Sequence, residues 1–232
     1  MAKTRTISLL AAATATSVCL CSPPAVADDT GFYVGANVGR VLSTFRRTDI
    51  DNGLIAAFGG AGSGFALGSS SVRKDHAMWS ADIGYMISRN FGIEASYLHL
   101  GSLAYSAAGT QPSLDGTGTS AVPVHADIKS GGPALAVLGV LPMSNLWEID
   151  ARVGAFAART TTTYSSVVHE NVNSGRVSKT STSLLAGVGT ALTVSSHCTV
   201  RVDYIRLEQV KEKTFNRAFN VDLVTAGVAF VF

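Results

Sequence analysis

Three groupings of histidine with a serine or an acid are the residues of this sequence with the clearest potential for chemistry. They are His76 with Ser80, His99 with Ser102, and His125 with Asp127. Hydrolysis needs a nucleophile, a base and an orienting acid that converge on one point. A serine and a histidine two residues apart share one face of a β-strand, and no grouping has a serine at that spacing. We therefore expect no catalytic residues and no enzyme.

The same histidines could instead hold a transition metal or haem, because imidazole is a common ligand of both. His76, His99 and His125 are expected near one external rim, with His169 and Glu170 in a loop beside it. Their spacing matches no metal motif, and scattered rim histidines are more often solvated surface residues. We expect no metal site and no cofactor, and keep haem or metal binding as an alternative.

Six ionisable residues show a clearer pattern, because each falls on the polar side of an alternating segment. They are Asp82, Glu94, Glu148, Arg152, Arg201 and Asp203. In a narrow interior with little water, an unpaired charge is strongly unfavourable and a paired charge needs good hydrogen bonds. We therefore expect these residues to form a lumenal charge network.

The segments that would position these residues alternate between apolar and polar side chains, which is typical of β-strands. In the first, Phe32 and Val34 alternate with Tyr33 and Asn37. Eight segments are expected, at about residues 32–39, 77–87, 93–97, 127–141, 147–154, 183–194, 200–204 and 221–232. Only the fourth is apolar on both sides, so its facing cannot be read locally.

The connections alternate between short and long. Short turns are expected at residues 88–90, 142–145 and 195–197, and long Gly-, Ser- and Thr-rich loops at 44–74, 102–125, 160–182 and 208–220. Transmembrane β-barrels have short periplasmic turns and longer external loops, and eight strands make a small closed barrel. No helix is expected after residue 27. The pattern predicts an all-β, eight-stranded antiparallel up-and-down transmembrane barrel.

The first 27 residues have the features of a secretory signal peptide: Lys3 and Arg5, an apolar run, and Ala25 and Ala27 before the cleavage site. Residues 28–232 would then form the barrel domain. Removing the two basic residues from 18 leaves 16 Lys and Arg against 16 Asp and Glu, which gives no electrostatic reason for a nucleic-acid partner. Cys198 would be the one remaining cysteine, so no intramolecular disulfide is expected.

The last residues resemble the signal by which the barrel-assembly machinery recognises outer-membrane barrels. Thr225 and Gly227 are followed by Phe230 and the terminal Phe232. A soluble eight-stranded calyx with its apolar face inward would show the same alternation. The terminal pattern and the loop asymmetry favour the membrane barrel, in which these aromatics point outward.

Several strands resemble the transmembrane domain of outer membrane protein A and its eight-stranded relatives. The similar segments are Phe32–Ala36, Gly92–Tyr97 with Leu100 and Gly101, Asp150–Gly154 and Val200–Tyr204. The resemblance implies a barrel in which a lumenal glutamate, here Glu94, exchanges between basic partners, here Arg201 and Arg152.

Two positions depart from that family. Val137 takes the place of a lumenal lysine and Gly189 that of an acid. We therefore favour a static network that plugs the lumen over a gate, and the gate stays open as the alternative.

The first long loop could also carry function. Residues 50–71 combine Leu54, Phe58 and Phe65 with many glycines, which suits either contact with another surface or folding over the barrel mouth. Arg46 and Arg47 beside it could hold lipopolysaccharide phosphates.

Together these features predict an integral outer-membrane protein of a Gram-negative bacterium, secreted with its signal peptide removed. We expect a structural and surface-interaction role, adhesin-like or antigen-like, through the external loops. The expected partners are outer-membrane lipid, lipopolysaccharide, the barrel-assembly machinery and host or environmental surface ligands. The alternatives are a narrow porin, a haem- or metal-binding barrel and, last, a lipid A-modifying enzyme.

Overall fold

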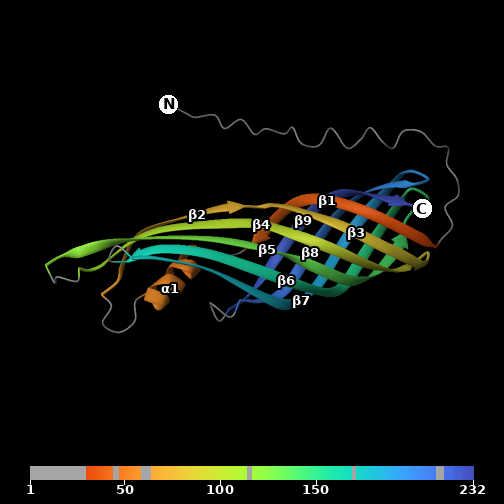
Figure 1. Ribbon diagram of the computed structural model, residues 1–232. Helices are drawn as coiled ribbons and strands as arrows, with labels where there is room; N and C mark the ends of the chain where they lie inside the picture. The colour runs from red at the N-terminus through yellow and green to blue at the C-terminus, as the bar shows by residue number, and fades with distance from the viewer. Residues whose placement is uncertain (1–29, 44–46, 59–63, 114–116, 169–170, 213–216) are drawn as a thin grey trace, which may run out of the picture.

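The chain forms one closed antiparallel sheet in the computed structural model, which describes residues 30–43, 47–58, 64–113, 117–168, 171–212 and 217–232 (Figure 1). Its strands are β1 (Gly31–Ser43), β2 (Ala66–Asp75), β3 (Ala77–Ser88), β4 (Phe91–Pro112), β5 (Thr119–Pro142), β6 (Trp147–Val168), β7 (Asn171–Ser195), β8 (Cys198–Glu212) and β9 (Arg217–Val231). The hydrogen-bonded order is β2-β4-β3-β1-β9-β8-β7-β6-β5, and β5 pairs back with β4. Eight strands therefore close the ring, and β2 lies outside it. The predicted fold is confirmed.

The outer surface of the ring is apolar. Phe32, Val38 and Leu135 are 58%, 67% and 63% exposed, whereas Tyr33 and Asn37, on the alternate positions of β1, are buried. Strand alternation thus places the large apolar side chains outside and the polar ones inside. The calyx alternative, which requires the opposite facing, is wrong.

Long sheet extensions replace the loops expected at residues 102–125 and 160–182. The hairpins β4–β5 and β6–β7 stay paired almost to their tips, and β2 pairs with the outer half of β4. In Figure 1 these strands continue to the left, beyond the ends of the other strands. The loop prediction was wrong here because Thr and Val favour strands, and hydroxyls pair across them, as in Thr161 with Ser178 at 3.0 Å.

The extension meets the barrel at an irregular junction. β2 and β3 are separated by His76, whose ring Nδ1 lies 2.9 Å from the carbonyl oxygen of Val41. On β4 the pairing shifts between His99 and Ser102, and Gly101 has a φ of 77°, a backbone conformation that glycine adopts without strain.

A helix that the sequence did not predict, α1 (Arg47–Phe58), packs against the extension. Ile50 is buried and Leu54 packs beside it, against a cluster that includes Tyr105, Val122 and Val124. Residues four apart share one helix face, but Asn52 and Gly53 have low helix propensity, so tertiary packing stabilises this helix. The first long segment therefore folds onto the extension. Within the described residues, no helix has the length and apolar character to cross a membrane.

A second apolar cluster fills the barrel between the extension and the polar layer described below. Its members come from every strand of the ring: Val41, Met78, Leu98, Ala134, Ala136, Phe156, Ala158, Leu185, Ile205, Leu207, Val221 and Leu223. Phe156, Leu207 and Leu223 have no solvent exposure. We call this set the lumenal apolar cluster. The expected signal peptide, with Ala25 and Ala27, lies outside the described residues.

Candidate functional site

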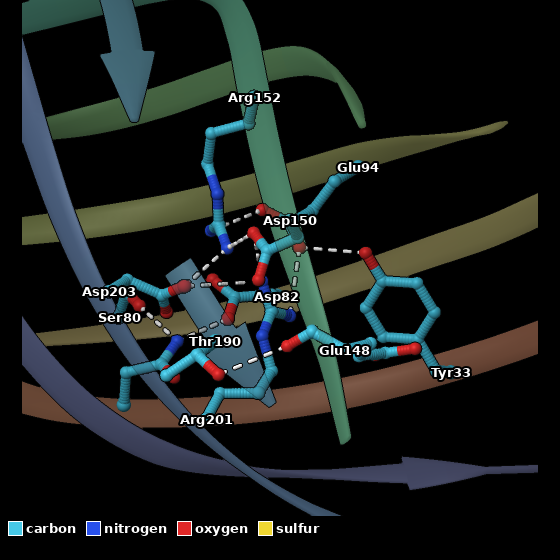
Figure 2. A network of polar contacts seen from close by, with 11 residues as sticks. Tyr33, Ser80, Asp82, Glu94, Glu148, Asp150, Arg152, Thr190, Arg201 and Asp203 are labelled. Carbon is cyan, nitrogen blue, oxygen red and sulfur yellow. Dashed lines mark hydrogen bonds and ion pairs between the residues drawn. The ribbon is translucent and has the colours of Figure 1, made fainter. Parts of the chain in front are cut away.

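Glu94 on β4 is the centre of a polar layer inside the barrel, near the short turns (Figure 2). Its Oε2 accepts a 2.7 Å hydrogen bond from the Tyr33 hydroxyl and a 3.1 Å bond from Arg201 Nη1. Its Oε1 accepts a 3.1 Å bond from Arg152 Nη1. Glu94 is 3% exposed, so three donors replace the water that its charge would otherwise need.

Arg152 joins Glu94 to a pair of aspartates. Arg152 Nη2 donates to Asp150 Oδ1 at 2.8 Å and to Asp203 Oδ1 at 2.6 Å. Arg201 lies at 3.8 Å from Asp203 Oδ1 and 4.0 Å from Asp150 Oδ1. Asp150 was missing from the expected network, although it shares the alternating face of Arg152 and Glu148.

Asp82 and Glu148 lie at the edge of this arrangement. Asp82 accepts a hydrogen bond from Asn37 Nδ2, which is also 2.9 Å from Ser80 Oγ. Glu148 is half-buried, and its carbonyl oxygen accepts a 3.0 Å bond from Thr190 Oγ1. Neither carboxylate forms an ion pair with a described residue. The structure thus brings together four of the six expected residues directly, and places Asp82 and Glu148 beside them.

Gly189 on β7 makes room for the two aspartates. A Cβ at this position would clash with the Asp203 carboxylate and lie 2.7 Å from Asp150 Oδ2. Gly84 plays a similar part for Tyr33, because a Cβ there would overlap the Tyr33 ring. These glycines explain how bulky groups fit in an eight-stranded lumen. Neither role could be inferred from the sequence.

Five carboxylates and two guanidinium groups share this layer, so its formal charge is negative. Asp150 Oδ2, Asp203 Oδ2 and Thr225 Oγ1 have no hydrogen-bond partner among the described residues, although all three are buried. Buried ion pairs hold position well but contribute little net stability. The layer is suited to fixing the strands and filling the lumen.

One family departure inferred from the sequence was wrong. Val137 is 58% exposed on the outer surface, because β5 directs its even-numbered residues inward from Ala134 to Val140. The inward neighbours of Val137 are Ala136 and Leu138, both buried. The segment expected at residues 127–141 is apolar on both sides, so alternation could not show which of its residues point inward.

The described histidines are not gathered into one site. The His76 ring contacts the Val41 carbonyl, His99 stacks on Trp79 at 5.6 Å, and His125 pairs with Ser106 at 3.0 Å. The described residues hold no group of three metal-ligating side chains. His169 and Glu170 lie outside them.

Ser106 and His125 form a serine–histidine contact that sequence spacing missed, because β4–β5 pairing creates it. The contact is solvent-exposed. Asp127 lies on the same face two residues along β5, but no hydrogen bond joins it to His125 in the described structure. We interpret Ser106 and His125 as a polar pair between neighbouring strands of an exposed sheet.

The C-terminal residues expected as an insertion signal lie on the seam between β9 and β1. Phe230 and Phe232 point outward, with ring centroids 5.2 Å apart, and Phe230 stacks on His197 at 5.7 Å. Thr225 points inward, and a Cβ at Gly227 would clash with Asn37. The Cys198 side chain is buried.

Comparison with known proteins identifies one family and several similar structures. Residues 27–232 match the family model described as OmpA-like transmembrane domain. The fold is similar to Ail, the attachment invasion locus protein of Yersinia pestis, with 13% identity and a TM-score of 0.46 over 88% of this chain and 97% of that chain. It is also similar to the N-terminal β-barrel domain of Pseudomonas aeruginosa OprF, with 12% identity and a TM-score of 0.44 over 88% of this chain and 98% of that chain. A third similar structure is the outer membrane protease OmpT of Escherichia coli, with 11% identity and a TM-score of 0.42 over 88% of this chain and 94% of that chain. No curated protein matches the sequence.

Proposed function

Because the chain belongs to the family of OmpA-like transmembrane domains, we propose that it acts without enzymatic chemistry, as a surface-interaction barrel. It is an integral β-barrel of the outer membrane. The part proposed to act is the sheet extension formed by β2 and the outer portions of β4, β5, β6 and β7. The extension would face the outside of the cell, and the short turns the periplasm.

The observation that carries this proposal is the regular pairing of β6 with β7 far beyond the barrel. Their register runs from Trp147 opposite Leu192 to Val168 opposite Asn171. Exposed, hydroxyl-rich strands on a rigid support suit recognition of other molecules, because binding then orders few additional residues. The edge of β7 from Asn171 to Thr182 is largely exposed.

The lumen supports a structural role rather than transport. A solute would have to pass both the ion-paired layer around Glu94 and the lumenal apolar cluster, in which Phe156 has no solvent exposure. Eight-stranded lumens are narrow enough for side chains to fill them. These two layers argue against the narrow-porin alternative.

Surface labelling tests the orientation and adhesion tests the role. In a Cys198→Ala background, a membrane-impermeant maleimide should label Thr163→Cys in the extension of intact cells but not Asn90→Cys in a short turn. Cells with full-length protein should adhere to wells coated with an extracellular matrix protein or a polyanionic glycan, and cells with residues 160–182 replaced by a tight turn should not. Equal adhesion of both cell types, at equal surface amounts, would contradict the proposal.

A further inference from the structure

Two basic residues lie on the outer surface at the junction between barrel and extension. Lys129 on β5 lies opposite Thr161 of β6, and Arg159 of β6 lies opposite Gly131 of β5. This register makes Lys129 and Arg159 diagonal neighbours on one face, about 7–8 Å apart. Both are exposed, and neither forms an ion pair in the described part of the chain.

Their height relative to the membrane follows from β6. Its outward residues are apolar from Trp147 through Ala157, a run of Trp147, Ile149, Ala151, Val153, Ala155 and Ala157. Ten residues extend about 33 Å along a strand, which is about 25 Å across a bilayer at the usual tilt. Arg159 is the next outward residue, so it lies at the level of the lipid headgroups.

Hydroxyl groups surround the two cations. Thr161 hydrogen-bonds to Ser178 of β7 at 3.0 Å, and Thr180 lies opposite Arg159. Farther out, Arg176 of β7 and Asp127 of β5 both lie opposite Thr163. Among the described residues on this face of β5, β6 and β7, three cations and one acid give a net positive charge. The combination suits a phosphorylated sugar, because cations and hydroxyls both bind phosphate and saccharide oxygens.

An exposed basic residue on β8 differs from these two cations. Arg206 of β8 lies 3.6 Å from Glu208 and 3.9 Å from Asp222. Asp222 also accepts a 2.8 Å hydrogen bond from the Tyr204 hydroxyl. The charge of Arg206 is therefore compensated within the protein.

We propose that Lys129 and Arg159 bind a phosphate of the phosphorylated glycolipid in the outer leaflet. The acyl chains of the lipid would lie along the apolar surface of β5 and β6 below, which includes Leu135 and Val153. This site differs from the lipopolysaccharide contact expected at Arg46 and Arg47. Arg46 lies outside the described residues. The proposal depends on the orientation assumed under the proposed function, but the binding test below does not.

Purified protein in phosphatidylcholine nanodiscs provides the test, with bis-phosphorylated lipid A as the probe and native mass spectrometry to count bound lipid. The wild type should retain lipid A and should bind its dephosphorylated form at least about tenfold more weakly, since each cation near a membrane surface contributes appreciably to binding an anionic lipid. Equal binding of the two forms would overturn the proposal. Displacement by millimolar inorganic phosphate would also overturn it, since it would indicate a general anion site.

Variants then locate the site. Lys129→Gln with Arg159→Gln should weaken binding of bis-phosphorylated lipid A by about tenfold or more, and Arg159→Lys should keep most of it. The matched control is Arg206→Gln, which removes an exposed but ion-paired cation and should leave binding unchanged. Heat-modifiable migration on a gel confirms that each variant is folded. Equal losses in the double variant and in Arg206→Gln would contradict the assignment.

Discussion

Tyr33 on β1 and Glu94 on β4 are hydrogen-bonded at 2.7 Å across the lumen, although β3 lies between their strands. The Tyr33 ring lies over Gly84 of β3, where any side chain would collide with it. Glu94 also accepts hydrogen bonds from Arg152 and Arg201. One carboxylate thus links four strands of the ring, and this arrangement leads to the first prediction.

Replacing Glu94 should destabilise the barrel. Glu94→Gln removes the carboxylate that both buried guanidinium groups share, while Arg152 keeps Asp150 and Asp203 as partners. The free energy of unfolding should fall by about 1.5–3 kcal/mol, as for the loss of a hydrogen bond to a charged group. Urea unfolding in detergent micelles would measure the loss. The matched control is Glu208→Gln, which removes an exposed pair with Arg206 and should change stability by less than about 1 kcal/mol. Similar values for the two variants would show that the layer does not fix the strands.

The steric role of Gly189 is equally testable. Gly189→Ala should destabilise the protein by about 1–3 kcal/mol, because the new methyl group must displace the carboxylates of Asp150 and Asp203. Gly139→Ala is the control, since its Cβ would meet nothing closer than 3.8 Å. Both are read by the same unfolding assay, and a neutral Gly189→Ala would contradict the packing described.

The lumenal apolar cluster should behave as a packed core. Phe156→Ala removes a side chain with no solvent exposure and should lower the free energy of unfolding by about 3–5 kcal/mol. Phe91→Ala removes an exposed ring on the outer surface and should cost clearly less in micelles. Equal losses would mean that the interior is loosely packed.

Docking of α1 should depend on the hydrogen bond between Tyr105 and Asp51, which is 2.7 Å long. Tyr105→Phe should weaken docking by about 1 kcal/mol and speed hydrogen exchange in Arg47–Phe58. Tyr97→Phe, on the outer surface of the barrel, is the control and should leave this exchange unchanged. Unchanged exchange in both variants would show that apolar packing alone holds the helix.

The sequence predicted the barrel well because strand alternation is a local property. Phe32 and Tyr33 already differ in polarity as their opposite facing requires. The sequence predicted the extension poorly, since serine- and threonine-rich segments read as loops until their partner strand is known. The helix was missed because Asn52 and Gly53 disfavour it locally.

The lumenal layer was partly readable for the same reason. Acids and bases at the polar positions of an alternating strand, such as Glu94 and Arg152, are easily recognised. Tyr33 and Gly189 did not, because their roles depend on side chains that enter from other strands. Val137 was assigned to the wrong side of the sheet because its strand is apolar on both faces, so alternation does not show which residues point inward.

Planar bilayer recordings test the central claim, a sealed barrel that acts through its outer extension. The wild type and Glu94→Ala should both show currents near the baseline, because the lumenal apolar cluster still closes the lumen when the ion-paired layer is broken. Steady openings of the wild type would contradict the sealed barrel. Openings that appear only in Glu94→Ala would also contradict it and would favour a pore gated by Glu94.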